Sequence, residues 1–363
     1  MPGAPNQQQN NQKHQTSGMQ TNPLNENRLN QLTQAANLKK LPLAKLISLF
    51  ENRSENAAQQ RHDIIHHINN HPKTFTGKGV TIGFTGTPGA GKSSLIAELC
   101  KTLTQNNDLR IAVLAIDPSS QKSGGAILGD RTRMHAGSKN KNLFFRSQAS
   151  NLELGGITHN TFQATRLLRH LFDLIIIETV GIGQNEIDIQ YMSDHTFLLM
   201  QPLAGDQIQF MKAGIMEIPD SFIVNKCDEE RLARTSYHML RASLKQSKLI
   251  VLNAKDNFEN AAKDNIFLTS AIKQKGIQEL AEFIQSIQRN DSNENNPSEN
   301  KQNKNKKPKD IENFYLQKAI QDLYGKFGLD ILTHEQEALN QLTGYEVKME
   351  FAITSIEQRI LRR

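Results

Sequence analysis

The segment Gly86 to Ser93, "GTPGAGKS", constrains the fold most, because its spacing works only between a buried strand and a helix. Its glycines let backbone N–H groups surround phosphates without a Cβ in the way. An apolar run, "VTIGFTG", precedes it, and a helical pattern, "KSSLIAELCKTL", follows with the positive end of its dipole toward the phosphates. Lys92 is therefore expected to reach the β- and γ-phosphates, and the Ser93 hydroxyl to bind Mg²⁺. The predicted phosphate-binding residues are Gly86, Gly89, Ala90, Gly91, Lys92, Ser93 and Ser94.

Eight apolar runs alternate with helical patterns between Val80 and about Gln285. Strands this continuously apolar are typical of a parallel sheet covered on both faces. The alternation predicts an α/β fold with a doubly wound, mostly parallel sheet, a helical N-terminal extension and a helical C-terminal tail. The runs are "VTIGFTG", "IAVLAID", "LFFRS", "DLIIIET", "HTFLLMQP", "SFIVNK", "KLIVLNA" and "NIFLTSA".

Changes of composition divide the chain into five segments. The first is rich in Gln, Asn and Pro with almost no apolar residues, so we expect it to be disordered. A polar Asn/Lys-rich linker separates the α/β domain from a last segment of amphipathic helices. The predicted segments are the tail 1–27, the helical extension 28–75, the P-loop domain 76–285, the linker 286–310 and the helical C-terminal segment 311–363.

Composition narrows the cellular setting. Two cysteines cannot form a disulfide framework, the N-terminus has no apolar signal region, and no apolar run approaches the ~18 residues that span a bilayer. We therefore expect a cytoplasmic protein that binds no membrane. The net charge of +6 owes much to the run "KQNKNKKPK" at 301–309, which is typical of a solvated tether, so we expect no nucleic-acid binding.

Two acidic residues end predicted strands near the P-loop. Glu178 follows "DLIII", where an acid helps to hold Mg²⁺ directly or through water. Asp117 ends "IAVLAI" and is placed to reach the same ion or its water. The backbone N–H of Gly181, three residues after Glu178, could sense a γ-phosphate. The predicted catalytic residues are Lys92, Asp117 and Glu178, and the predicted metal ligands are Ser93, Asp117 and Glu178.

The loop "VNKCD" indicates which base is bound. Asp228 can accept two hydrogen bonds from guanine, whereas adenine offers no such pair of donors. Asn225 is expected to tie the loop down, and the stem of Lys226 to lie over the base. The segment "TSA" at 269–271, with Ser270 and Ala271, can add a backbone N–H to guanine O6. The motifs in this order predict GTP and GDP, rather than ATP, as the ligands.

Four histidines, His62, His66, His67 and His71, include pairs with the i,i+4 spacing of a helical metal site. We interpret them instead as a polar helix face outside the nucleotide domain. Cys227 lies inside the predicted base loop and Cys100 on the helix that follows the phosphate loop, so both are poor candidates for zinc or nickel ligands.

The ordered motifs resemble the MeaB/ArgK family, the G-protein chaperones of adenosylcobalamin-dependent acyl-CoA mutases, chiefly methylmalonyl-CoA mutase. The resemblance runs from about residue 41 to 285, including the lead-in "LAKLISLFENR". It rests on "GFTGTPGAGKSSL", "LAIDPSSQKSGGAILGDRTRM", "LGGITHNTFQATRLL", "DLIIIETVGIGQNE", "MQPLAGDQIQFMKAGIMEIPDSFIVNKCD" and "TSA".

The resemblance implies a Mg²⁺-dependent GTPase that gates cofactor loading or protection of such a mutase, and a homodimer formed through the C-terminal end. The segment 202–212 resembles the family's mobile coupling loop, although Gln207 replaces its usual acid. The C-terminal tail does not follow the usual pattern closely. Ile182 follows Gly181 and Gln184 is displaced, so no residue is placed to orient water as in small GTPases. We expect slow intrinsic hydrolysis that a partner stimulates.

Two other functions stay open from the sequence. A metallochaperone GTPase for another metalloenzyme would need a metal-ligand cluster beside the nucleotide. A transport-associated ATPase or kinase would need adenine, against which the N-K-x-D motif at Asn225 to Asp228 argues.

Overall fold

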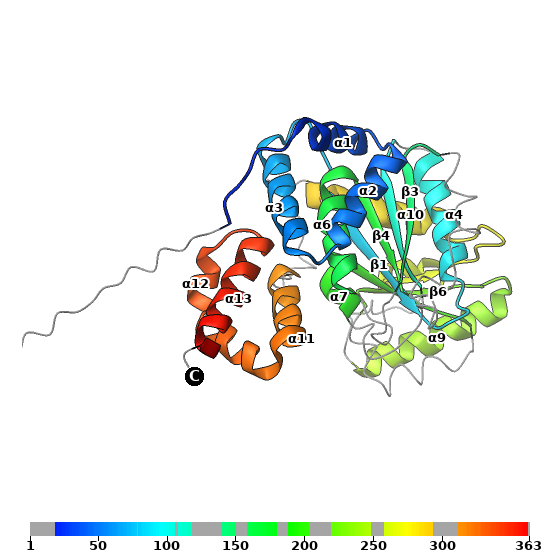
Figure 1. The fold of residues 1–363 in the computed structure, drawn as a ribbon. Helices are drawn as coiled ribbons and strands as arrows, with labels where there is room; N and C mark the ends of the chain where they lie inside the picture. The colour runs from blue at the N-terminus through cyan, green and yellow to red at the C-terminus, as the bar shows by residue number, and fades with distance from the viewer. Residues whose placement is uncertain are drawn as a thin grey trace, which may run out of the picture.

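The computed structural model describes residues 19–77, 79–105, 108–117, 140–149, 158–179, 188–202, 219–247, 258–292 and 311–361 (Figure 1). Within these ranges seven strands form one sheet in the order β3-β2-β4-β1-β5-β6-β7, with every neighbouring pair parallel. The strands are β1 (Val80–Gly86), β2 (Ile111–Asp117), β3 (Leu143–Ala149), β4 (Leu174–Glu178), β5 (His195–Met200), β6 (Ser221–Val224) and β7 (Ile266–Leu268).

The predicted doubly wound α/β fold is confirmed. Seven of the eight predicted apolar runs coincide with these strands, although β3 extends two residues beyond its run, to Ala149. The eighth, at 248–254, lies outside the described residues. Between β6 and β7, where a described helix at Glu230–Ser247 joins two neighbouring strands, that helix supplies the crossover that parallel neighbours require.

Strand β1 lies in the middle of the sheet, between β4 and β5, and is buried along its whole length. Phe84 is in register with Glu178 on β4 and with Phe197 on β5. The rings of Phe84 and Phe197 stack with centroids 5.2 Å apart. This packing fixes the end of β1, at Gly86, in the centre of the sheet's carboxyl edge, where doubly wound sheets bind ligands.

Alternate side chains of each strand enter separate cores. Ile175 and Ile177 of β4 belong to one apolar cluster, whereas Leu174 and Ile176 belong to the cluster on the opposite face. This alternation follows from the two-residue period of a strand. Helices cover both faces (Figure 1). They are α4 (Lys92–Gln105) and α10 (Ile277–Ser292) on one side, and α6 (His159–Leu171), α7 (Ile189–Met192), α9 (Glu230–Ser247) and the 3₁₀ helix η3 (Phe258–Asp264) on the other.

Three helices precede the sheet: α1 (Glu26–Ala36), α2 (Lys40–Glu51) and α3 (Glu55–Asn70). Side chains cap two of them, because Asn25 accepts from Arg28 N and Ser54 accepts from Ala57 N. Residues 1–18 of the predicted disordered tail lie outside the described residues. Residues 19–27 are described, with the backbone N–H of Asn22 hydrogen-bonded to Asp63 on α3 at 2.9 Å.

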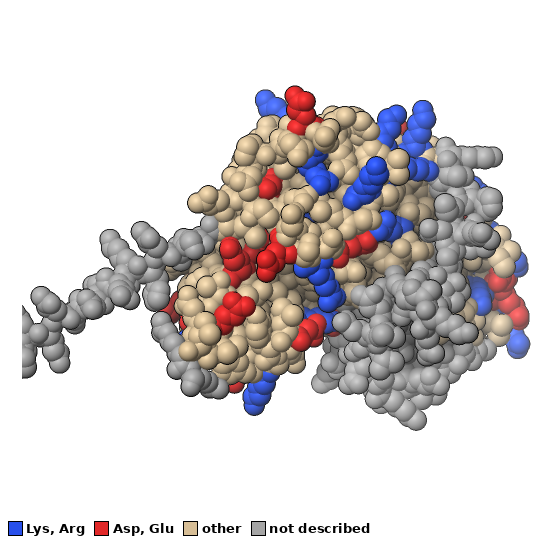
Figure 2. Space-filling view, in the orientation of Figure 1, with Lys and Arg blue, Asp and Glu red and all other residues tan. Residues whose placement is uncertain are grey.

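The predicted helical C-terminal region consists of α11 (Ile311–His334), α12 (Gln336–Gln341) and α13 (Tyr345–Leu361). These helices pack beside α3, α6 and α7 (Figure 1), and the aromatic ring of Tyr315 stacks on Phe162 of α6 at 4.4 Å. Charged side chains of both signs lie where the C-terminal helices meet the rest of the molecule (Figure 2). Helix α10 continues to Ser292, beyond the predicted linker start at 286, and Ile287 packs against the same apolar cluster as Ile284. Residues 293–310 of the linker lie outside the described residues.

Candidate nucleotide-binding site

The loop after β1 needs glycine at two positions for steric reasons. Gly86 has φ +150, and a Cβ there would lie 2.2 Å from the carbonyl oxygen of Leu199 on β5. Gly91 has φ +85, and its Cβ would lie 2.7 Å from Nδ2 of Asn225. Side chains would therefore push the loop away both from the sheet and from the loop after β6.

The loop encloses the side chain of Lys92. Lys92 begins α4 and is only 6% exposed, and its Nζ donates to the carbonyl oxygens of Gly86 at 2.7 Å and Thr87 at 3.1 Å. Ala90 is fully buried, while Gly89 and Ser94 are exposed. A positive charge thus lies within a loop built of small residues, which is the arrangement that holds phosphates.

Ser93 and Glu178 meet although 85 residues separate them. The Ser93 hydroxyl donates to Oε1 of Glu178 at 2.5 Å, and Glu178 is 5% exposed at the end of β4. A hydroxyl and a carboxylate side by side are hard oxygen donors that suit Mg²⁺. The residues present therefore fit that ion.

Of the other residues predicted near the phosphates and Mg²⁺, Asp117 is described only in its backbone and Gly181 is not described. The backbone of Asp117 ends β2, two residues beyond Ala115, which is in register with Glu178. Asp117 therefore lies at the same edge of the sheet, and its side chain is outside the description. Gly181 also lies outside the described residues.

Asn225 joins the base loop to the phosphate loop. It is 1% exposed, its Nδ2 donates to the carbonyl oxygen of Ala90 at 2.8 Å, and its Oδ1 accepts from the Thr269 hydroxyl at 3.1 Å. Because a buried amide without partners is costly, these bonds hold three loops in one arrangement. Asn225 therefore contacts both the phosphate loop and the segment after β7.

The other residues of the base loop are placed by the segment after β7. The Ser270 hydroxyl donates to Oδ1 of Asp228 at 2.5 Å, and Nζ of Lys273 donates to the Asp228 carbonyl oxygen at 2.7 Å. Ala271 follows Ser270 directly, in the turn between two backbone bonds that Ser270 and Lys275 exchange. The carboxylate of Asp228 is therefore held by Ser270 of the predicted "TSA" segment.

One residue that the sequence did not single out lies between the two loops. Gln201 follows β5 directly, and its Oε1 accepts a hydrogen bond from Nζ of Lys226 at 3.0 Å. A polar residue directly after an apolar central strand was the available signal, because such a position lies at the ligand-binding edge of the sheet.

Both cysteines are buried. Burial raises the pKa of Cys100 to about 12 and that of Cys227 to about 11. Neither thiol is set up to act as a thiolate at neutral pH. Cys227 instead supports the base loop, since its backbone N–H donates to the Thr269 carbonyl oxygen at 2.9 Å.

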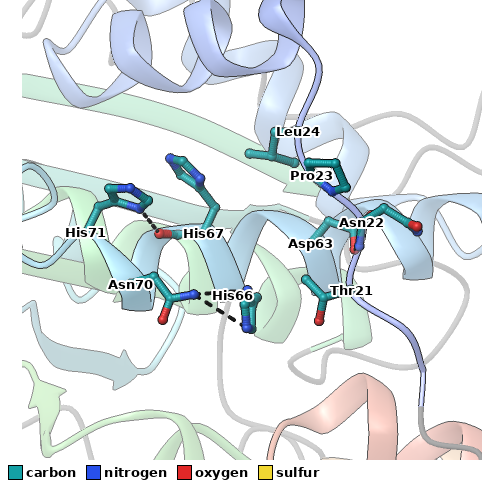
Figure 3. Close-up of a pocket in the computed structure, with 9 residues that line it drawn as sticks. All are labelled: Thr21, Asn22, Pro23, Leu24, Asp63, His66, His67, Asn70 and His71. Carbon is teal, nitrogen blue, oxygen red and sulfur yellow. Dashed lines mark hydrogen bonds between the residues drawn. The ribbon is translucent and has the colours of Figure 1, made fainter.

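His66, His67 and His71 line a cavity of about 260 Å³ together with residues 21–24, and no residue of the nucleotide site lines it (Figure 3). The rings of His67 and His71 stack at 4.1 Å, and Asn70 contacts His66. In the part of the chain that the structure describes, no group of three or more His, Cys, Asp or Glu side chains could hold a metal ion.

A buried ion cluster fastens the C-terminal helices to the rest of the molecule. Glu346 of α13 pairs with Arg166 of α6 at 2.5 Å and with Arg61 of α3 at 3.3 Å. Burial alone would raise the pKa of Glu346, but the charges of Arg166 and Arg61 reverse this and lower it. Sequence reasoning missed the cluster, because Arg61 and Glu346 are 285 residues apart.

The parallel sheet, the phosphate loop and the attached N-K-x-D loop define a P-loop protein of the GTPase class. The chain matches the family described as methylmalonyl-CoA mutase-associated GTPase MeaB over residues 43–324. It belongs to this family, and the resemblance seen in its motifs is confirmed.

Individual relatives agree with this placement. A Pyrococcus abyssi protein that is named as a GTPase is 40% identical over 67% of this chain and 70% of its own length. A Caenorhabditis elegans protein named mitochondrial methylmalonic aciduria type A homolog is 42% identical over 42% of this chain and 39% of its own length. A solved structure described as a LAO/AO transport system kinase covers 94% of this chain and 100% of its own, with 20% identity and a TM-score of 0.52, and supports the fold alone.

Proposed function

We propose that this chain is a Mg²⁺-dependent GTPase that binds GTP and GDP and hydrolyses GTP to GDP and phosphate. The observation that carries the proposal is the hydrogen bond from Asn225 to the Ala90 carbonyl oxygen at 2.8 Å. This bond ties the loop that carries Asp228 to the phosphate loop, which supports a single site for the guanine base and the phosphates.

Each residue has a chemical task in this proposal. The ammonium of Lys92 balances phosphate charge, and Asp228 accepts hydrogen bonds from the guanine edge. Ser93, Glu178 and Asp117 would hold Mg²⁺, which neutralises phosphate charge when bound. Gly181 would sense the γ-phosphate, and Ser270 and Ala271 would face the base.

Hydrolysis is proposed to be slow in isolation and stimulated by a partner. The proposed partner is an adenosylcobalamin-dependent acyl-CoA mutase, whose cofactor loading or protection the GTPase would gate. The family description and the printed name of the C. elegans relative support this choice. None of the described helices combines the length and apolar content that crossing a bilayer requires. The proposed location is the cytoplasm.

A homodimer is proposed through the C-terminal helices. Leu323 of α11 is 60% exposed and Leu361 at the end of α13 is 85% exposed, whereas large apolar side chains are mostly buried in this protein. Light scattering on the eluted peak of a sizing column would measure the mass. A monomer at all concentrations would count against the dimer but not against the GTPase.

The test is phosphate release from GTP by the purified chain, alone and with a cobalamin-dependent acyl-CoA mutase from the same cell. We expect slow turnover alone and strong stimulation by the mutase. Lys92→Ala should abolish turnover, and Lys101→Ala, an exposed lysine of the same helix, should not. Turnover without stimulation would keep the GTPase and reject this partner. A preference for ATP over GTP would favour the transport ATPase or kinase instead.

A further inference from the structure

Gln201 is hydrogen-bonded to the base loop and lies next to the phosphate loop. Its Oε1 accepts from Nζ of Lys226 at 3.0 Å. Its Nε2 is the nearest atom to the position that a Cβ on Gly89 would take, at 3.7 Å. The amide of Gln201 therefore lies against the tip of the phosphate loop while its oxygen holds the lysine of the base loop.

Lys226 is a residue that needs such a partner. Its backbone has φ +62, the left-handed region that non-glycine residues rarely adopt. Backbone bonds on either side hold that conformation: Asn225 N donates to the Met200 carbonyl oxygen, and Cys227 N to that of Thr269, both at 2.9 Å. The long side chain is exposed, so it would sample many rotamers if nothing fixed its ammonium.

We propose that Gln201 is a positioning residue for the nucleotide: it holds the ammonium of Lys226 so that the lysine stem is already extended along the base before the ligand arrives. This inference rests on the proposed guanine-nucleotide binding. Holding a side chain in its bound conformation lowers the ordering cost of binding.

The contacts of Gln201 determine which step of nucleotide binding should change when it is substituted. Gln201 reaches the base side of the site and the outer tip of the loop, and Glu178 and Ser93 belong to a separate pair. GTP and GDP should therefore be affected alike, chiefly in how fast they leave. Selection of guanine by Asp228 should not depend on Gln201, because the lysine stem contacts the face of the base and not its edge.

The experiment compares the parent with three single variants of the full chain and with the double variant that combines Gln201→Met and Lys226→Met. Gln201→Met keeps the volume but removes the acceptor, Gln201→Glu keeps an acceptor, and Lys226→Met removes the donor. Dissociation of N-methylanthraniloyl GDP and GTP is followed by stopped-flow fluorescence, together with KM and kcat for GTP. Melting temperatures report on folding.

We expect Gln201→Met to release both nucleotides about 3- to 10-fold faster, the effect of one lost hydrogen bond. KM should rise by a similar factor with little change in kcat, and the affinity ratio of guanosine to inosine nucleotides should stay unchanged. Gln201→Glu should restore release to within about twofold of the parent. Adding Lys226→Met to Gln201→Met should change the release rate little further, because both substitutions remove the same hydrogen bond.

Other outcomes overturn the inference. Release unchanged in Gln201→Met, full additivity with Lys226→Met, or failure of Gln201→Glu to restore binding would each reject the positioning role. A lower melting temperature with unchanged release would identify a structural contact only. A parent chain that binds neither nucleotide would instead reject the proposed function, so the two failures are distinguishable.

Discussion

At the scale of single residues, Asp228 is held in place by protein contacts. One carboxylate oxygen receives the Ser270 hydroxyl at 2.5 Å, and the backbone carbonyl receives Lys273 Nζ at 2.7 Å. A carboxylate fixed in this way can accept from guanine without losing rotamer freedom on binding. Base selection should therefore depend strongly on this one side chain.

Asp228→Asn should reverse the preferred base. The amide offers a donor where guanine also has donors, so two charge-assisted hydrogen bonds are lost and GTP affinity should fall by about 100-fold or more. Xanthine presents an oxygen in place of the 2-amino group, so XTP binding should improve. Competition of each triphosphate against a fluorescent guanine nucleotide measures the change. Glu229→Gln, a change at the exposed neighbouring acid, is the control and should leave the preference as it is.

Glu346→Gln should destabilise the whole protein. Glu346 is 4% exposed, and its carboxylate pairs with the guanidinium groups of Arg61 and Arg166. Removing its charge therefore leaves two buried positive charges without full compensation. Loss of one partner from such a cluster costs about 3 kcal/mol. Urea unfolding followed by circular dichroism measures the cost. Glu335→Gln, which changes a more exposed pair with Arg359, should cost well under half as much, and equal costs would show that burial is not the cause.

The stability should fall on the acid side of neutrality because of His159. Burial, and then the charges of Arg53 and Arg61, lower its pKa to about 4 from the usual 6.5. Between these values the unfolded chain binds the proton and the folded chain does not. Each pH unit of decrease from 6.5 to 4 therefore removes about 1.4 kcal/mol at this site.

His159→Gln should reduce that acid sensitivity. The urea midpoint should fall less between pH 7 and pH 5 in this variant than in the parent, while the matched change at an exposed histidine, His66→Gln, should follow the parent. His170, whose pKa burial also lowers to about 4, should retain part of the dependence. If the urea midpoint of His159→Gln fell with pH as steeply as that of the parent, His159 would not be a source of the acid sensitivity.

At the scale of elements, helix α11 is broken at Gly325. The residue has φ +61 and ψ −151, a backbone region that is open essentially to glycine alone. A Cβ there would meet nothing within 4 Å, so any cost of a side chain comes from the backbone and not from a clash. The kink lets both halves of α11 bury apolar residues, Leu316 and Ile320 before it and Ile331 after it.

Gly325→Ala should destabilise the C-terminal helices by about 1–3 kcal/mol, although alanine favours a continuous helix. Hydrogen exchange of amides in α11 and α13 should quicken, and the chemical midpoint should fall. Lys326→Ala, at the next exposed position, serves as the control and should change stability little. A gain in stability in Gly325→Ala would mean that the kink is not required.

The sequence predicted the individual strands and loops better than it predicted the helix kink and the contacts between distant elements. Strands such as β4 are marked by local apolar runs, and the phosphate and base loops by spacing that chemistry imposes. The kink at Gly325 was not predicted, because a glycine inside a helical pattern does not by itself show whether the helix breaks. The Glu346 cluster and the contact of Gln201 with Lys226 depend on which elements become neighbours, which residue patterns do not state.

At the scale of the whole molecule, the C-terminal helices share one apolar cluster with the N-terminal helices and one face of the sheet. Tyr191 of α7 stacks on Phe314 of α11 at 4.1 Å, and Lys318 of α11 pairs with Asp188 just before α7. Helix α7 and the residue before it therefore contact α11 directly. Such shared burial favours a single cooperative unit.

Two tryptophan probes can test this cooperativity, because the chain contains no tryptophan. Phe314→Trp reports on α11, and Phe283→Trp reports on α10 at the opposite face of the sheet, where Phe283 packs on Phe267 at 4.8 Å. Fluorescence of each variant and circular dichroism should give the same urea midpoint. Saturating GDP should raise all of them equally, because it binds only the folded unit.

Divergent midpoints would give a different picture of the molecule. If the Phe314→Trp signal were lost at lower urea than the Phe283→Trp signal in the same conditions, the C-terminal helices would detach before the sheet unfolds. Each variant carries its own control, since circular dichroism shows whether its overall midpoint has moved from that of the parent. Coincident midpoints that GDP raises together would mean that the nucleotide site and the C-terminal helices gain and lose structure as one.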